Sequence, residues 1–138
     1  MRPFLLVIAF LTMTSRGRAE GVVDYSGQIK PILQTRCYAC HGVLKQKAGL
    51  RLDTAAFATK GGEGGPAIDL KDADASPLIE RISSKEDSER MPPEGEPLKP
   101  AEIAAIRAWI TQGARAPADE QPESDPRDHW AFKTPVRP

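Results

Sequence analysis

The segment Cys37-Tyr38-Ala39-Cys40-His41 constrains the fold of this chain more than any other feature. Cys37 and Cys40 are the only cysteines in the sequence, and their spacing places both thiols on one turn of a helix. Two thiols so placed can form thioethers with the two vinyl groups of a haem, and a histidine directly after the second cysteine can ligate the iron. The segment therefore predicts one covalently attached haem c, with His41 as an axial ligand.

The apolar content of the chain agrees with a bulky cofactor in its core. Leu, Ile, Val and Phe together make up about one fifth of the 138 residues, the level at which a core built from side chains alone becomes doubtful. The 13 prolines predict frequent breaks and therefore short helices. A large apolar ring would supply the part of the core that the side chains do not.

The two ends of the chain differ in composition from its middle. Residues 1–19 have a positive start, an apolar run too short to span a bilayer and small residues before a cleavage point. This pattern predicts a secretory signal peptide and an exported protein, periplasmic or in an equivalent compartment, without stable membrane insertion after cleavage; an uncleaved anchor is the alternative.

Beyond the predicted domain, at 20–113, the chain becomes polar. Residues 114–128 contain no Leu, Ile, Val or aromatic residue, which predicts a disordered linker. Aromatic residues return in 129–138, which we expect to be the truncated start of a downstream region.

The cysteine pair has alternatives to haem. In an exported protein two cysteines ordinarily form a disulfide, and Cys-X-X-Cys is also a thiol-exchange motif. The flanking sequence lacks the strand-then-helix pattern of a thioredoxin-like site. A zinc site would need a fourth ligand besides Cys37, Cys40 and His41, for which the sequence offers His129.

The second axial position of the iron separates electron transfer from catalysis. After the signal peptide the chain holds one methionine, Met91, and one further histidine, His129. Met91 precedes two prolines, which stiffen a loop without needing backbone donors, and a thioether ligand raises the potential of haem iron. We expect Met91 to be the second ligand. A methionine that only fills the core, and ligation by His129, are the alternatives.

Periodic apolar residues predict helices at about 26–36, 76–82 and 100–112, with a further short turn at 54–59. Ser76 is expected to cap the second helix and Pro77 to occupy its first position. Lys99 precedes the third and is a poor cap, although Glu102 can return a bond to the backbone, and Gly113 ends that helix. Since no run alternates as a strand does, the predicted fold class is all-α, with three to five short helices.

Several residues between these elements are candidates for the wall of a pocket or for ordinary core. They are Leu50, Leu52, Ile68, Leu78, Ile79, Ile82 and Trp109. The glycine-rich run 61–66 lacks the Lys-Ser/Thr pair of a phosphate-binding loop. We expect it to be backbone that turns sharply or passes close to the haem.

Taken together, the motifs resemble the planctomycete-type cytochrome c domain over about residues 23–113. The segments that carry the resemblance are 23–33, 37–42, 47–53, 61–68, 76–79, 90–93 and 98–110. The resemblance implies a class I-like cytochrome c fold with one covalent haem, ligated by His41 and Met91. Residues 129–132 resemble the junction that leads into large downstream domains in such proteins.

The expected function is that of an electron-transfer domain, not an enzyme. The 19 basic residues balance the 19 acidic ones, which argues against a nucleic-acid binder. No nucleophile–base pair has motif context, and two histidines leave little for acid–base work. The partner would be an unidentified redox protein or downstream domains of the same polypeptide. Haem-based catalysis or small-ligand sensing at an open sixth position, and a non-haem thiol module, are the alternatives.

Overall fold

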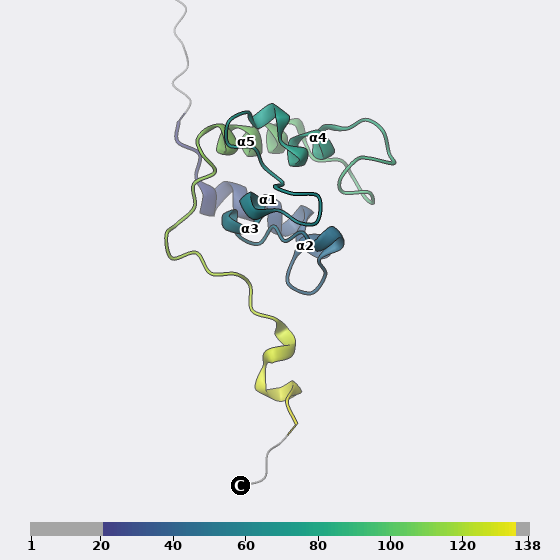
Figure 1. Ribbon diagram of the computed structural model, residues 1–138, viewed down its shortest axis with the longest axis vertical. Coiled ribbons are helices and arrows are strands. Elements are labelled where there is room, and N and C mark those ends of the chain that lie inside the picture. The colour runs from purple at the N-terminus through teal and green to yellow at the C-terminus, as the bar shows by residue number, and fades with distance from the viewer. Residues whose placement is uncertain (1–20, 135–138) are drawn as a thin grey trace, which may run out of the picture.

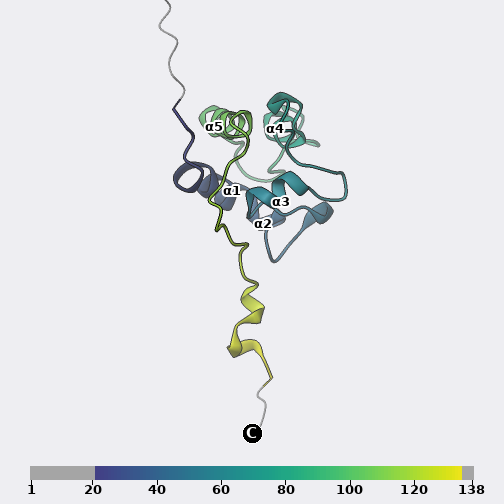
Figure 2. The same ribbon diagram turned by 60° about the vertical axis from the view of Figure 1, so that its left-hand side comes forward.

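The computed structural model describes residues 21–134, so the signal peptide expected at 1–19 lies outside the described residues. The described residues form helices and no strand, which confirms the all-α class. The helices are α1 (Lys30–Arg36), α2 (Tyr38–His41), α3 (Ala55–Lys60), α4 (Pro77–Ser83) and α5 (Pro100–Thr111). In both ribbon views α4 and α5 lie above the group formed by α1, α2 and α3 (Figures 1 and 2). Within residues 21–134, no helix is both long and apolar enough to cross a membrane.

The first predicted helix is present but consists of two parts. A π-helical turn, Tyr25–Ile29, leads directly into α1, and the side chain of Asp24 caps it by accepting the Gly27 N–H at 3.0 Å. Pro31 lies at the junction between the π-helical turn and α1, where its fixed φ suits the helix. The helix stops at Arg36, so the cysteine motif begins after a break in the helix rather than within it.

The short turn predicted at 54–59 is α3. The Thr54 hydroxyl accepts the Phe57 N–H at 3.1 Å and so satisfies one of the free donors of the first turn. Gly61 ends the helix with a φ of 76°, a left-handed conformation that favours glycine. A Cβ on Gly61 would lie 1.8 Å from the carbonyl oxygen of Gly65. The sharp turn expected of the glycine-rich run is therefore confirmed.

The capping prediction for α4 was wrong, whereas the prediction for α5 was confirmed. Ser76 and Pro77 occupy the predicted positions, but the Ser76 hydroxyl accepts the N–H of Asp69 at 2.8 Å and does not cap α4. The expectation of a serine cap was wrong because this fully buried hydroxyl satisfies a donor of the preceding loop. At α5 the carboxylate of Glu102 accepts the Lys99 N–H at 2.6 Å, as expected.

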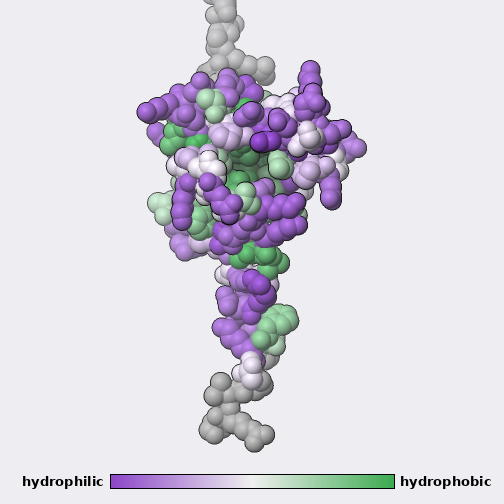
Figure 3. Space-filling model, turned by 45° about the vertical axis from the view of Figure 1, so that its right-hand side comes forward, coloured by the Kyte–Doolittle hydropathy of each residue, from purple (hydrophilic) through white to green (hydrophobic). Residues whose placement is uncertain are grey.

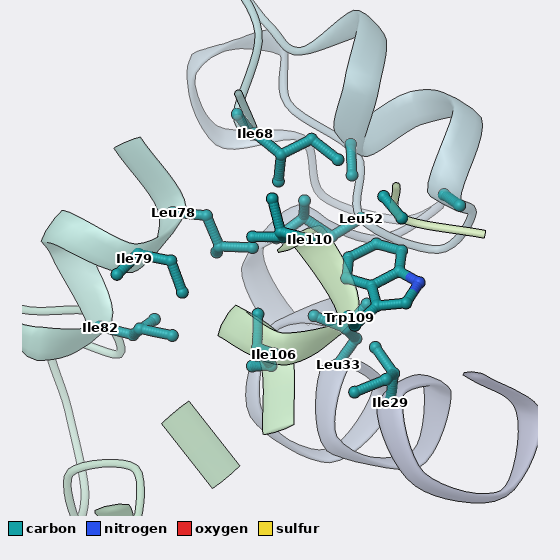
Figure 4. Close-up of a cluster of buried hydrophobic side chains, with 14 of the residues drawn as sticks. Ile29, Leu33, Leu52, Ile68, Leu78, Ile79, Ile82, Ile106, Trp109 and Ile110 are labelled. Carbon is teal, nitrogen blue, oxygen red and sulfur yellow. The ribbon is translucent and has the colours of Figure 1, made fainter. Parts of the chain in front are cut away.

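Helix α5 is the centre of the hydrophobic core. Its residues Ile106, Trp109 and Ile110 lie between the apolar face of α4 and the face of the first helix that carries Ile29 and Leu33 (Figure 4). The Trp109 ring stacks on Tyr25, with ring centroids 5.4 Å apart. This packing holds the upper helices against α1, which leads into the cysteine motif.

Candidate cofactor pocket

One cavity of about 710 Å³ opens between the two helical groups. Its walls come from α2, residues 45–52, the glycine-rich run with Ala67, α4, and the loop 91–96. In the space-filling view this region is a hollow with apolar residues inside and hydrophilic residues around it (Figure 3). Its volume falls within the ~300–1,000 Å³ typical of cofactor and small-molecule sites.

All four sequence-predicted site residues line this cavity. Cys37, Cys40 and His41 reach it from the α2 side, and Met91 reaches it from the loop that precedes α5. His129 is not among the described residues that line it. The fold therefore gathers Met91 with a motif far away in the sequence, while its role as a ligand stays a prediction.

Local hydrogen bonds fix the turn that carries the motif. The Cys37 N–H donates to the Leu33 carbonyl at 2.8 Å, so the chain continues from α1 although the φ of Cys37, −122°, is not helical. The N–H of His41 donates to the Cys37 carbonyl at 2.8 Å. Because residues at i, i+3 and i+4 share one face of a helix, the two thiols and the imidazole meet the same cavity. The Leu52 N–H then donates to the His41 carbonyl at 2.8 Å, which ties the end of α2 to the next segment.

Met91 is held by its backbone. Its N–H donates to the carbonyl of Arg81 in α4 at 2.9 Å, and the Arg90 guanidinium donates to the Pro92 carbonyl at 3.1 Å. The Met91 side chain is half-buried and packs against the hydrophobic core. The loop is thus anchored to α4 through the Met91 backbone, and the thioether extends from this anchored residue.

The state of the two thiols bears on the alternatives to haem. Both cysteines are free in the structure. Burial raises the pKa of Cys37 to about 12, with Arg36 opposing the shift, so this sulfur is a protonated thiol at neutral pH. A thiol-exchange site needs a thiolate. Among residues 21–134, no three His, Cys, Asp or Glu side chains are placed to hold a metal ion together.

The donor set and the cavity fit a haem. Burial lowers the pKa of His41 against the opposing effect of the Leu50 and Lys47 backbone carbonyls, and the lowered pKa favours the neutral ring, the form that ligates iron. Its Nδ1 atom is buried without a hydrogen-bond partner. Two thiols, an imidazole and a thioether around one apolar cavity are the groups that c-type haem attachment and iron ligation use.

The predicted pocket wall is confirmed in part. Leu50, Leu52, Leu78 and Ile82 line the cavity. The remaining three candidates, Ile68, Ile79 and Trp109, are buried in the core and do not line it. The Trp109 ring stacks on Tyr25 in the core, and its Nε1–H donates to the Arg115 carbonyl at 2.9 Å.

Charged residues at the cavity were not predicted as site residues. Arg36, Lys45, Lys47 and Arg81 line it, and so do Glu94 and Glu96. The Arg36 guanidinium donates to the carbonyl of Glu96 and so joins the end of α1 to the loop that follows Met91. The position of Arg36 directly before Cys37 is the one signal in the sequence that could have pointed to it.

Comparison with known proteins identified one family. Residues 37–95 match the family model described as Planctomycete cytochrome C, which confirms the resemblance inferred from the motifs. This segment includes all four predicted site residues and the cavity-lining residues that lie between them in the sequence. No curated protein and no solved structure matched the chain. Over this segment the chain is therefore similar to the planctomycete cytochrome c family.

Proposed function

We propose that this chain is an exported electron-transfer domain that carries single electrons on one haem c. The haem would be attached through Cys37 and Cys40 and ligated by His41 and Met91. The observation that carries the proposal is the convergence of these four side chains on one cavity. The electron donor and acceptor would be a redox partner protein or downstream domains of the same polypeptide.

Each residue has a distinct task in this proposal. The two thiols would anchor the haem from one turn of helix, and the imidazole and the thioether would ligate its iron. The bound haem supplies one-electron chemistry at its iron. Leu50, Leu52, Leu78 and Ile82 exclude water from the site, which tunes the potential of a bound redox centre.

The contacts of Met91 support its proposed role as the second ligand of the iron. Met91 lines the cavity, its N–H is bonded to α4, and the Arg90 side chain closes the same loop onto the Pro92 carbonyl. A residue whose backbone is held in this way needs less ordering to bind a metal, so the entropic cost of ligation is reduced. Haem catalysis or small-ligand sensing would need this position to be open or labile.

The first prediction tests the sixth ligand. We expect the oxidised, haem-loaded protein to show the weak near-infrared band of sulfur-to-iron charge transfer. Met91→Ala should abolish that band, lower the reduction potential and admit carbon monoxide to the ferrous iron, because the thioether favours ferrous iron and blocks the site. Absorption spectra and a redox titration measure all three changes.

Two matched variants serve as controls for this test. His129→Ala removes the other possible ligand, and Leu70→Ala shortens a half-exposed side chain that does not line the cavity. Both should leave the spectrum and the potential unchanged. If the wild-type protein binds carbon monoxide rapidly and Met91→Ala changes nothing, the sixth position is open. That result would overturn the electron-carrier proposal in favour of haem catalysis or sensing.

A further inference from the structure

The chain does not leave the domain where α5 ends. Gly113, with a φ of 90°, turns the backbone, and the next residue, Ala114, is buried in the core. The carbonyl of Arg115 accepts the indole N–H of Trp109 at 2.9 Å. From there the polypeptide passes down along α1 and α3 (Figure 1). This path covers the first part of the segment whose composition predicts a disordered linker.

Glu120 is the main contact of this path. One of its carboxylate oxygens accepts the Tyr25 hydroxyl at 2.6 Å and the Lys30 ammonium at 2.8 Å. The other accepts the Ala55 N–H, at the start of α3, at 3.0 Å. The side chain is only 8 % exposed. Three donors, from the π-helical turn, α1 and α3, therefore converge on one nearly buried carboxylate.

A second contact follows three residues later. The Glu123 N–H donates to the Asp53 carboxylate at 2.9 Å, and the Glu123 carbonyl accepts from the Arg51 guanidinium at 3.4 Å. Asp53 is completely buried and paired with Arg51. The segment is thus bonded to side chains or backbone at both ends of the stretch 114–123.

These contacts are made with segments that connect directly to the turn that faces the cavity. Asp53 follows Leu52, whose N–H holds the His41 carbonyl, and Lys30 begins the helix that ends just before Cys37. Tyr38 lies in the same turn. Burial, and then the carboxylates of Glu123, Asp53 and Glu120, raise the pKa of its phenol above the ordinary value.

We propose that residues 114–123 form a strap that belongs to the folded domain, fastened by Glu120, and that this strap braces the turn carrying Cys37, Cys40 and His41. A fastened strap joins α1 to α3 and bonds, through Glu123, to Asp53, the residue after the one whose N–H holds the His41 carbonyl. When the strap detaches from the domain, the turn that carries Cys37, Cys40 and His41 loses these contacts and unfolds locally more often. The strap therefore couples the position of the residues after 123 to the rigidity of the turn that lines the cavity. The proposal is independent of the sixth ligand and of electron transfer.

Limited trypsin digestion of the haem-loaded protein tests the strap. Arg115 lies inside the strap, whereas Lys133 lies beyond it and serves as an internal reference within the same molecule. We expect Glu120→Ala to raise the rate of cleavage after Arg115, relative to Lys133, about tenfold, because three charge-assisted bonds are lost. Asp119→Asn is the matched control, since it removes a carboxylate from the neighbouring, exposed residue.

Amide hydrogen exchange on the same variants tests the brace. The N–H groups of Cys40 and His41 both bond to the Cys37 carbonyl, and their exchange should be several-fold faster in Glu120→Ala. Tyr25→Phe removes only one donor and keeps the ring that stacks on Trp109, so it should show a smaller change of the same kind if Glu120→Ala fails to fold.

Two results would overturn the proposal. Equal cleavage after Arg115 in Glu120→Ala and Asp119→Asn would show that Glu120 fastens nothing. Faster cleavage with unchanged exchange of the Cys40 and His41 amides would show a strap that does not support the turn. Coordinated acceleration of both signals, graded from Tyr25→Phe to Glu120→Ala, is the result expected.

Discussion

Replacing Asp53 by Asn should destabilise the domain more than most other single substitutions of a charged residue. Asp53 is completely buried. Its carboxylate accepts from Arg51 Nε at 2.9 Å, from a second Arg51 nitrogen and from the Glu123 N–H at 2.9 Å. Asparagine keeps the shape of the side chain but removes the charge. Its amide NH₂ group would also face the N–H donors of Arg51 or Glu123, with which it cannot form a hydrogen bond.

The size of the effect follows from what the substitution leaves behind. Breaking a buried ion pair by removing one partner costs about 3–5 kcal/mol, because the remaining charge is unpaired. The Arg51 side chain is 19 % exposed, so water can recover part of its solvation, and we expect about 3 kcal/mol. For a domain of this size each kcal/mol shifts the Tm by roughly 4–8 °C, so the Tm should fall by at least about 12 °C.

Guanidinium unfolding of the haem-loaded protein, followed by circular dichroism, measures this loss. Asp119→Asn is the control, since it makes the same chemical change at an exposed position and should cost less than about 0.5 kcal/mol. A loss below about 1 kcal/mol for Asp53→Asn would refute the reasoning that the pair is an integral part of the fold.

The pH dependence gives a second check on the same residue. Burial alone would raise the pKa of Asp53, but the Arg51 hydrogen bonds and the Glu123 N–H outweigh it and lower the pKa below its ordinary value. A depressed pKa stabilises the fold above the unfolded value of about 3.9 and loses that contribution as the pH falls through the folded value. The difference between wild type and Asp53→Asn should therefore shrink below about pH 4. A difference that stays constant down to pH 2 would contradict this assignment.

Three further predictions concern packing and the cofactor. Gly61→Ala should cost more than about 2 kcal/mol in chemical denaturation because its Cβ would overlap a carbonyl oxygen, whereas Gly64→Ala, with open space around it, should be neutral; equal losses would contradict the assigned geometry. Ser76→Ala should cost about 1–2 kcal/mol by leaving the part-buried Asp69 N–H without a partner, and unchanged stability would argue against that bond. Expression without haem attachment should give a largely unfolded chain, and a cooperative thermal transition of that apoprotein would contradict this expectation.

The helices could be predicted because their signals are local. Apolar spacing, a proline in the first turn and a terminal glycine act within a few residues, and α1, α4 and α5 all begin or end close to the expected positions. The Ser76 cap failed because a hydroxyl has several acceptable donors, and the preceding loop supplied one that no local pattern encodes.

The candidate site could also be predicted, for a chemical reason. Cys37, Cys40 and His41 form a local motif, and Met91 was the only thioether left after the predicted signal peptide. Elimination in a short sequence therefore substituted for knowledge of the fold. The pocket wall was harder to assign, since an isoleucine facing the cavity and one facing α5 have the same hydrophobicity. Ile82 lines the cavity and Ile79 does not, although both lie on α4.

The contacts of residues 114–123 could not be predicted from the composition of that segment. A stretch without large apolar residues cannot bury enough surface to order itself, and that physical rule is sound. It describes a segment that must provide its own core, whereas this one uses donors that the domain already presents. Tyr25, Lys30 and the start of α3 place three donors around one point, so a single carboxylate, that of Glu120, gains bonds without bringing apolar area with it. Such an arrangement depends on elements that are far apart in the sequence, and no window of neighbouring residues could reveal it.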